Sequence, residues 1–309
     1  MIGRIITCGH ETYQMPDLLS WEVRRTGSVP CDSYSITCLY TAEMAPLLHQ
    51  AVSCLLLAGE QLILHGIADE YVIDRSESGS VVTVSGRGYA ARLLDNESRA
   101  ATYSAATLAD IIRNHVTPYG ISCASCADTR ASGVYTVASG SSQWKALEGF
   151  CLTYGGFSPR FAADGSLRAS PPEAGNRFSI DAGTQLLSLS KRENHYGVLS
   201  EVLVIDKTQN VSYSVKNRDF LDRGGSCRRV LYTPGRSNWA SMRYTGEYQI
   251  ARSKADEISV TAVLPGTAAV SPGDTVYVDV EGISGTFHAA SVEYAADGAG
   301  ETTTLELKE

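Results

Sequence analysis

The stretch that most constrains the fold is residues 81–121, VVTVSGRGYAARLLDNESRAATYSAATLADIIRNHVTPYGI. It starts with the β-branched pattern of a strand, passes two glycines and a polar run, and then changes to helical spacing. Thr107 and Asp110 have the spacing of a capping box, which predicts that a helix begins there. Pro118 and Gly120 predict where that helix ends. The stretch therefore connects a β-rich unit to a unit that contains helices.

The region before the helix, residues 1–100, is predicted to be an antiparallel β-meander. Short runs of strand-forming residues alternate with turn residues, for example at residues 27–30. Residues 45–57 are predicted to form a short helix, because their leucines and Ala51 fall near helical spacing. The first unit is therefore β-rich with one short helix.

Residues 101–176 are predicted to be a small α+β domain. The helix after Thr107 places His115 on its buried face, and a second helix is expected to start near Ser142. The pair Asp164-Gly165 between two strand-like runs predicts a hairpin. Two helices and a hairpin make up this unit.

Residues 177–309 are predicted to be β-rich again. Paired strands are expected at residues 198–206 and 211–215, and a helix at about residues 240–255. Residues 219–227 are predicted to be a mobile loop. Four more strands are expected between residue 258 and residue 307.

The third unit repeats part of the first. An alignment without gaps that places His65 opposite His288 also places Tyr71 opposite Tyr294. Such a match predicts a duplicated unit. The expected fold class is mainly β with an α+β insert: two similar antiparallel β-barrel domains, at residues 1–100 and 177–309, flank the small α+β domain at residues 101–176.

Composition limits the partners. The formal net charge is −8 and no run of Lys or Arg stands out, which argues against binding nucleic acid by phosphate neutralisation. No apolar segment has the length of a secretory signal or a membrane span, so we expect no membrane insertion. The eight cysteines are scattered, and we expect free thiols.

One motif has the form of a dinucleotide-binding loop. Gly86, Gly88 and Ala91 fit G-x-G-x-x-A after a strand. A polar run follows within a few residues, and no alternation of strands and helices surrounds the motif. We therefore expect these glycines to mark a place where the backbone packs closely.

Cys123 and Cys126 form an isolated C-x-x-C motif. Zinc would need two further ligands, and no matching pair lies nearby in the sequence. We expect neither metal binding nor redox chemistry at this pair.

Catalytic patterns are absent or weak. The six histidines are dispersed, and no G-x-S-x-G nucleophile elbow is present. If the chain were a hydrolase of cell walls, its acids would come from Glu148, Asp164 and Glu173 in the middle unit. This hypothesis stays open beside the leading one.

The densest basic spot comprises Arg223, Arg228 and Arg229. A solvated loop explains it most simply. The functional alternative is a contact with an acidic neighbour in an assembly.

Several segments in a fixed order carry a family resemblance. They are GRGYAARLLDNES, YSAATLADIIRNHVTPYGI, DGSLRAS, NHYGVLSEVLVID and PGDTVYVDVEGISGTFHAASVEYAADGAGETTTLELKE. Together they resemble the late control D family, the baseplate hub proteins of contractile phage tails. The resemblance covers most of the chain.

This resemblance implies a homotrimer in which three chains present six similar barrels. Such a ring matches the hexameric tail tube on one face and a trimeric central spike on the other. The implied partners are the tail tube protein, the spike protein, the tape measure protein and other baseplate proteins. The implied location is the baseplate of a virion or phage-tail-like particle, assembled in the bacterial cytoplasm.

The resemblance also implies a structural protein, with no enzyme activity, no cofactor, and no catalytic, cofactor-binding or metal-binding residues. Because the sequence stops soon after its last expected strand, we expect the spike and any wall-cutting enzyme to be separate polypeptides. Besides the wall hydrolase, one alternative stays open. It is a hub at the base of a fibre or tail-associated lysin in a non-contractile tail.

Overall fold

The computed structural model describes residues 1–26, 31–173, 175–233 and 239–309. The turn expected at residues 27–30 lies outside this part of the chain. The fold contains 49% strand and 19% helix, which confirms the mainly β class. Among the described residues, none of the helices combines the length and the apolar character that a membrane span requires.

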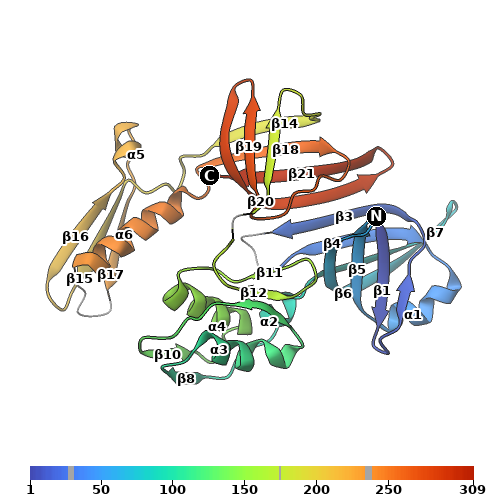
Figure 1. The fold of residues 1–309 in the computed structure, drawn as a ribbon, viewed down its shortest axis with the longest axis horizontal. Coiled ribbons are helices and arrows are strands. Elements are labelled where there is room, and N and C mark those ends of the chain that lie inside the picture. The colour runs from blue at the N-terminus through green and yellow to red at the C-terminus, as the bar shows by residue number, and fades with distance from the viewer. Residues whose placement is uncertain (27–30, 174, 234–238) are drawn as a thin grey trace.

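One large sheet of thirteen strands contains strands from both ends of the chain (Figure 1). Its N-terminal strands are β1 (Ile2–Thr7), β2 (Thr12–Gln14), β3 (Leu18–Thr26), β4 (Ser33–Leu39), β5 (Ala51–Ala58), β6 (Gln61–Ser76) and β7 (Gly79–Gly88). Its C-terminal strands are β13 (Arg177–Asp181), β14 (Ser188–Glu193), β18 (Ile258–Pro265), β19 (Thr275–Val280), β20 (Ile283–Asp297) and β21 (Gly300–Lys308).

The strand order is β3-β4-β7-β6-β5-β1-β2 in the N-terminal group and β14-β18-β21-β20-β19-β13 in the C-terminal group. In the part of the chain that the structure describes, neither group closes into a barrel by strand pairing. The two expected barrels therefore stay a prediction, whereas the two groups of mostly antiparallel strands are observed.

Alternation along the strands builds the core of this sheet. In β4 the buried residues Tyr34, Ile36 and Cys38 alternate with partly or fully exposed neighbours. In β21 Leu305 and Leu307 are fully buried in the same way. These side chains belong to one apolar cluster that includes both strand groups. The period of two in the sequence thus puts every second side chain on the core side.

The hairpins β6–β7 and β20–β21 have the same register. Each ladder shifts at a bulge in its first strand, between Ala68 and Glu70 in one hairpin and between Ala289 and Ser291 in the other. The end pairs of the two ladders, Ser76 with Gly79 and Asp297 with Gly300, then also correspond. The internal repeat is therefore visible in the structure as two equivalent hairpins.

This register differs by two residues from the alignment expected from the sequence. It places Thr286, not His288, at the position of His65, so the expected equivalence of the two histidines is wrong. A shift of two residues keeps every side chain on its own face of the sheet, because the strand period is two. The hydrophobic pattern could not distinguish the two alignments.

Residues 45–57 are only partly helical. The elements here are the 3₁₀ turn η1 (Ala42–Met44) and α1 (Ala45–His49), after which the chain enters β5. The expected helix is therefore wrong beyond residue 49. Short apolar runs fit both periods, and here the pairing of β5 with β1 and β6 decides.

The middle part of the chain forms a separate core of helices and short strands. Its elements are α2 (Ala91–Leu94), β8 (Ala101–Ser104), α3 (Leu108–His115), η2 (Thr117–Tyr119), β9 (Cys123–Cys126), β10 (Val134–Val137), α4 (Gln143–Phe150), the π-helical turn η3 (Cys151–Gly155), β11 (Arg160–Phe161) and β12 (Leu167–Ala169). The capping box is confirmed, since the side chains of Thr107 and Asp110 each accept a hydrogen bond from the other's backbone amide. The hairpin around Asp164 is also confirmed.

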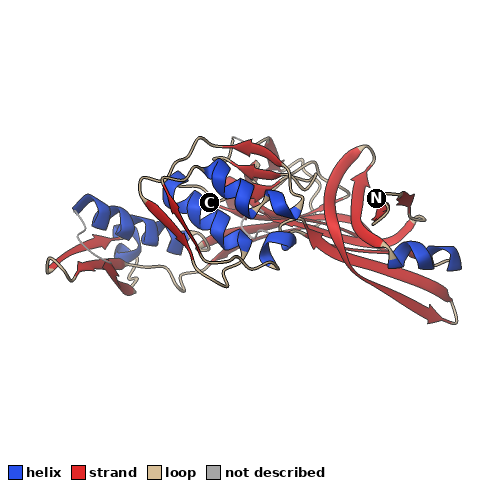
Figure 2. Ribbon diagram, turned by 90° about the horizontal axis from the view of Figure 1, so that it is seen from below, coloured by secondary structure: helices blue, strands red, loops and turns tan. Residues whose placement is uncertain are grey.

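A small unit is inserted between β14 and β18. It comprises β15 (Glu201–Asp206), β16 (Val211–Lys216), α5 (Arg218–Asp222), β17 (Arg228–Thr233) and α6 (Trp239–Lys254). Val202, Val204 and Met242 are fully buried in its own apolar cluster. Figure 2 shows this unit at the end of the molecule opposite the N-terminus.

Within this inserted unit, the expected strand pair and the expected long helix are confirmed. The loop expected at residues 219–227 is wrong in its first part, where α5 forms. Asn217 caps α5 by accepting a hydrogen bond from the amide of Phe220. This cap was not predicted from the sequence, although Asn is a preferred residue at the position.

Candidate assembly interface

The two strand groups are joined by a direct pairing of β3 with β20. Thr26 lies opposite Ser291 and Trp21 opposite Ala296, with an uninterrupted antiparallel register between them (Figure 1). Val23 and Tyr294 form one of the central pairs, and both are buried. This pairing turns the two groups into one sheet.

Strand β20 can accept two partners because it is long. Its first half, up to His288, pairs with β19, and its second half, from Ser291, pairs with β3 along the same edge. The opposite edge is occupied by β21 throughout the second half. The bulge at the midpoint separates the two halves.

Strand β6 has the same design, but its second half has an open edge. Its first half pairs with β5 as far as Ile67, and β7 occupies the other edge up to Ser76. In the described part of the chain no strand pairs with residues 70–76 on the side of β5. Tyr71 and Val72 are about two-fifths exposed there, at 40% and 42%. An exposed apolar strand edge is a surface to which another strand can add.

A second open edge belongs to β14. This strand pairs with β18 on one side and ends the sheet on the other. All its residues are exposed except Leu189, which is half-buried. Among the described strands, β6 and β14 thus each present an open edge, and the two edges differ in sequence.

The glycines of the G-x-G motif lie inside β7 and not in a phosphate-binding loop. A Cβ atom on Gly86 would lie 1.9 Å from the carbonyl oxygen of Ile67, so only glycine fits there. Arg87 between the glycines bonds to Asp69 at the bulge of β6 (2.8 Å) and to Asp95 (2.8 Å). The expectation of close backbone packing is confirmed.

Cys123 and Cys126 lie on the exposed strand β9. Partial burial raises the pKa of both thiols, which favours the protonated form rather than a metal-binding thiolate. Neither belongs to the cluster of potential metal ligands found among the described residues.

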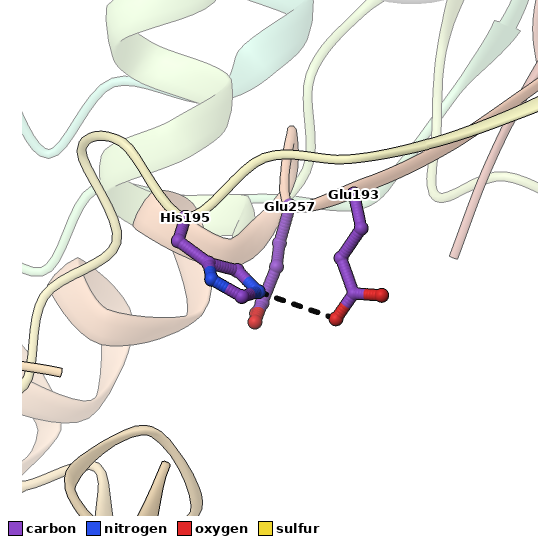
Figure 3. A group of neighbouring side chains, drawn as sticks. All are labelled: Glu193, His195 and Glu257. Carbon is purple, nitrogen blue, oxygen red and sulfur yellow. Dashed lines mark hydrogen bonds and ion pairs between the residues drawn. The ribbon is translucent and has the colours of Figure 1, made fainter. Parts of the chain in front are cut away.

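That cluster consists of Glu193, His195 and Glu257 (Figure 3). The Nε2 atom of His195 lies 3.3 Å from an oxygen of Glu193. Arg223 also reaches this place, forming ion pairs with Glu193 (3.2 Å) and with Glu257. The pKa of Glu193 is lowered, mainly by its hydrogen bond to His195 and to a smaller extent by nearby positive charges such as Arg223. Arg223 balances the negative charges of the two carboxylates. Because Arg223 directly follows α5 and Glu193 belongs to β14, these ion pairs hold α5 against β14.

The basic spot is used within the chain. Besides Arg223, Arg228 forms an ion pair with Glu201 at 2.7 Å, and Arg229 donates to Gln249 at 3.1 Å. These bonds favour the simple interpretation of a solvated, internally paired surface.

Neither of the two cavities described among the placed residues brings together the three acids considered for a hydrolase. Glu148 lines a cavity of about 560 Å³ between the middle part and α6, and neither Asp164 nor Glu173 lines it. The carboxylate of Asp164 accepts two bonds from Ser166, at 2.6 and 2.9 Å, which lower its pKa. Asp164 therefore stabilises its own turn.

Two histidines connect elements. His65 lies 3.0 Å from the hydroxyl of Tyr89 and 3.3 Å from the carbonyl of Asp164, so it links β6 to the middle part. His115 is buried between Tyr103 (2.9 Å) and Gln143 (2.6 Å). Its expected place on the buried face of the helix is confirmed.

Comparison with solved structures finds this arrangement elsewhere. A tail protein from Neisseria meningitidis matches with a TM-score of 0.78 over 100% of this chain and 96% of its own, at 18% identity. A prophage tail protein from Shewanella oneidensis matches with a TM-score of 0.81 over 99% and 97%, at 15% identity. The chain has the fold of phage tail proteins.

This tail-protein fold extends to secretion machines. A component of the Escherichia coli type VI secretion system, itself described as structurally similar to the T4 tail proteins gp27 and gp5, matches with a TM-score of 0.57. It shares 12% identity, over 94% of this chain and 73% of its own. No protein-family model and no curated protein matches the chain by sequence. The resemblance expected from the sequence is thus confirmed at the level of the fold.

Proposed function

We propose that the chain is a structural baseplate hub subunit of a contractile phage tail or a phage-derived injection particle. Three copies form a ring that adapts the hexameric tail tube to a trimeric central spike. The chain acts by assembly and carries no enzyme activity. Its place is the baseplate of the virion or particle.

The observation that carries this proposal is the pair of equivalent hairpins, β6–β7 and β20–β21, placed in one sheet by β3 and β20. One chain thus presents the same structural feature twice. Three chains present it six times, which suits a partner with six-fold symmetry on one side and three-fold symmetry on the other. The match over nearly the whole length of two tail proteins supports the same conclusion.

The division of the chain follows from this proposal. Residues 1–100 and 177–309 form the two tube-like domains, and residues 101–176 form the α+β domain between them. The tail tube protein and the central spike protein are the partners of the ring, with the tape measure protein and other baseplate proteins as further contacts. The inserted unit between β14 and β18 is a peripheral addition to the second domain.

Light scattering of the purified chain tests the ring. We expect a species of three times the chain mass of 33.1 kDa, either alone or after addition of the tube or spike protein. A chain that stays monomeric at high concentration with both partners would contradict the proposal. Incubation with purified peptidoglycan tests the structural role, and release of muropeptides would contradict it.

A further inference from the structure

We propose that copies of this chain join by strand addition: β14 of one copy pairs antiparallel with the open second half of β6 in the next copy. The proposal rests on the ring described above and adds the surfaces and the register by which its subunits meet. It follows from the internal joint, in which β3 pairs with the second half of β20.

The accepting edge is equivalent in the two halves of the molecule. The shared bulge register matches Ser291 to Glu70 and Ala296 to Arg75. In β20 this segment holds β3, whereas in β6 the same segment is open in the described part of the chain. A strand edge that is filled in one repeat and open in the other calls for a strand of the same kind from outside.

The donating strands are equivalent as well. Tyr34 of β4 pairs with Gly86 of β7, and Val260 of β18 pairs with the matching residue Leu307 of β21. Strand β3 lies on the outer side of β4, where Val23 faces Tyr34. Strand β14 lies on the outer side of β18, where Lys191 faces Val260. Therefore β14 corresponds to β3, and Lys191 corresponds to Val23.

These two correspondences fix the register between copies. Val23 lies opposite Tyr294 in the internal joint, and Tyr294 matches Ile73. Lys191 of one copy is thus opposite Ile73 of the next, Arg192 is opposite Val72, and Ser190 is opposite Asp74.

The backbone of β14 is oriented for this pairing. The amide of Asn194 donates to the carbonyl of Glu257 on the side of β18, at 2.7 Å. In an antiparallel strand alternate residues point their amides to opposite sides, so Glu193, Lys191 and Leu189 direct theirs to the open edge. The amide of Thr26, which matches Asn194, likewise points toward the side of β4, where it bonds to Asp32 at 2.8 Å.

Charge supports the same register. In this register Arg192 of one copy lies opposite Val72 of the next. Glu70 and Asp74, two residues before and after Val72 on β6, lie on the same face of the sheet and are therefore the diagonal neighbours of Arg192. Cross-strand neighbours of opposite charge stabilise a sheet. In the pairing of β3 with β20, Arg24 corresponds to Arg192 and lies opposite Glu293. The pairing within one chain and the proposed pairing between copies thus both place an arginine next to a carboxylate.

The contact is head-to-tail, because each copy donates β14 at one end and accepts at β6 at the other. A head-to-tail contact gives a closed ring when its rotation closes and an open filament when it does not. In the ring of three, three internal and three external joints of the same kind alternate around the axis.

Disulfide trapping tests the register. The exposed native cysteines Cys8, Cys123 and Cys126 are first changed to Ser, and one chain then receives Ser190→Cys and another Asp74→Cys. Directly opposite residues in an antiparallel sheet have the separation that a disulfide needs. Mild oxidation of the mixture, alone or with the tube or spike protein, is expected to give a dimer band that neither chain gives alone.

The matched control replaces Asp74→Cys by Ser76→Cys, which lies on the same face but two residues away. We expect its cross-linking with Ser190→Cys to be slower by about tenfold, because diagonal residues exceed disulfide reach. Equal rates for both mixtures, or no cross-link for either, overturn the proposed register.

A charge reversal provides an independent measurement. Arg192→Glu is expected to weaken self-association by about tenfold, and Asp74→Arg in the same chain is expected to restore part of it. Light scattering of the unmodified chain distinguishes a failure of the proposed ring from a failure of the proposed strand addition. Trimers that do not cross-link at these positions contradict the strand addition and leave the hub function intact, whereas assemblies larger than trimers whose chains do cross-link at these positions contradict the ring and leave the strand addition intact.

Discussion

Tyr294 of β20 lies directly opposite Val23 of β3, although the two residues come from opposite ends of the chain. The hydroxyl of Tyr294 donates to the buried carbonyl of Val270 at 2.7 Å. The side chains of Tyr294 and Val23 are both almost completely buried. The N-terminal strand β3 therefore finds its outer partner only in a strand from the other end of the chain. Such distant pairings carry a large loop-closure cost and are slow to form.

Tyr294→Phe tests the contribution of the Tyr294–Val270 hydrogen bond to stability. The change removes one hydrogen bond and leaves the carbonyl of Val270 buried without it, so we expect the free energy of unfolding to fall by about 1–2 kcal/mol. Denaturant titration measures the effect. Tyr277→Phe, on the more exposed strand β19, serves as the control and is expected to change little. Equal effects of both changes would contradict a stabilising role of this hydrogen bond.

Gly86→Ala tests the origin of the G-x-G motif. The new methyl group would collide with the carbonyl oxygen of Ile67 and with the ring of Tyr34, so we expect a loss of about 3 kcal/mol or failure to fold. Gly298→Ala is the control, because its Cβ atom has no neighbour within 4 Å. A Gly86→Ala protein of unchanged stability would contradict this explanation, because β6 and β7 would then have to move apart at Ile67 without a loss of free energy.

Thr107→Ala tests the capping box of α3. Loss of the side chain that accepts from the amide of Asp110 is expected to lower the free energy of unfolding by about 1 kcal/mol. Thermal or denaturant unfolding followed by circular dichroism measures the change. Thr102→Ala on the exposed strand β8 is the matched control, and a similar loss there would remove the cap as the explanation.

The protonation of His65 is expected to give the protein a pH-dependent stability. Burial, more than the charge of Arg92, lowers the pKa of His65 below its ordinary value of 6.5. The unfolded chain then binds a proton that the native chain does not, so stability falls as the pH drops below about 6.5 and levels off below the native pKa.

Unfolding titrations between about pH 7.5 and pH 5.5 measure this slope. His65→Gln is expected to flatten the slope, because it removes the titrating group, whereas the exposed His49→Gln is expected to leave it unchanged. An unchanged slope in His65→Gln would show that other groups cause the pH dependence.

Local signals in the sequence predicted local structure well. The alternation of β4 and β7, the capping box of Thr107 and the hairpin turn at Asp164 each depend on residues close together in the chain. The same reasoning failed at residues 51–57, where an apolar run fits a helix and a strand equally. It also missed the cap at Asn217, which makes a helix out of a polar segment.

For the candidate interface, the sequence indicated a duplication but not its register. The pattern of buried and exposed residues has a period of two, so an alignment with His288 and the observed one with Thr286 were equivalent in pattern. The bulges at Ala68 and Ala289 and the end pairs of the two hairpins fixed the match, and both depend on strand pairing. The open edges of β6 and β14 were invisible for the same reason.

The sequence by itself determined the class of this protein: strands by alternation, helices by caps and spacing, and a repeat of similar hairpins. Only the tertiary structure decided that β3 pairs with β20, that Gly86 lies against Ile67, and that one half of β6 stays open. The physical reason is that side-chain periodicity is written into neighbouring residues. The choice of a strand's partner depends on hydrogen bonds between segments that are far apart in the chain.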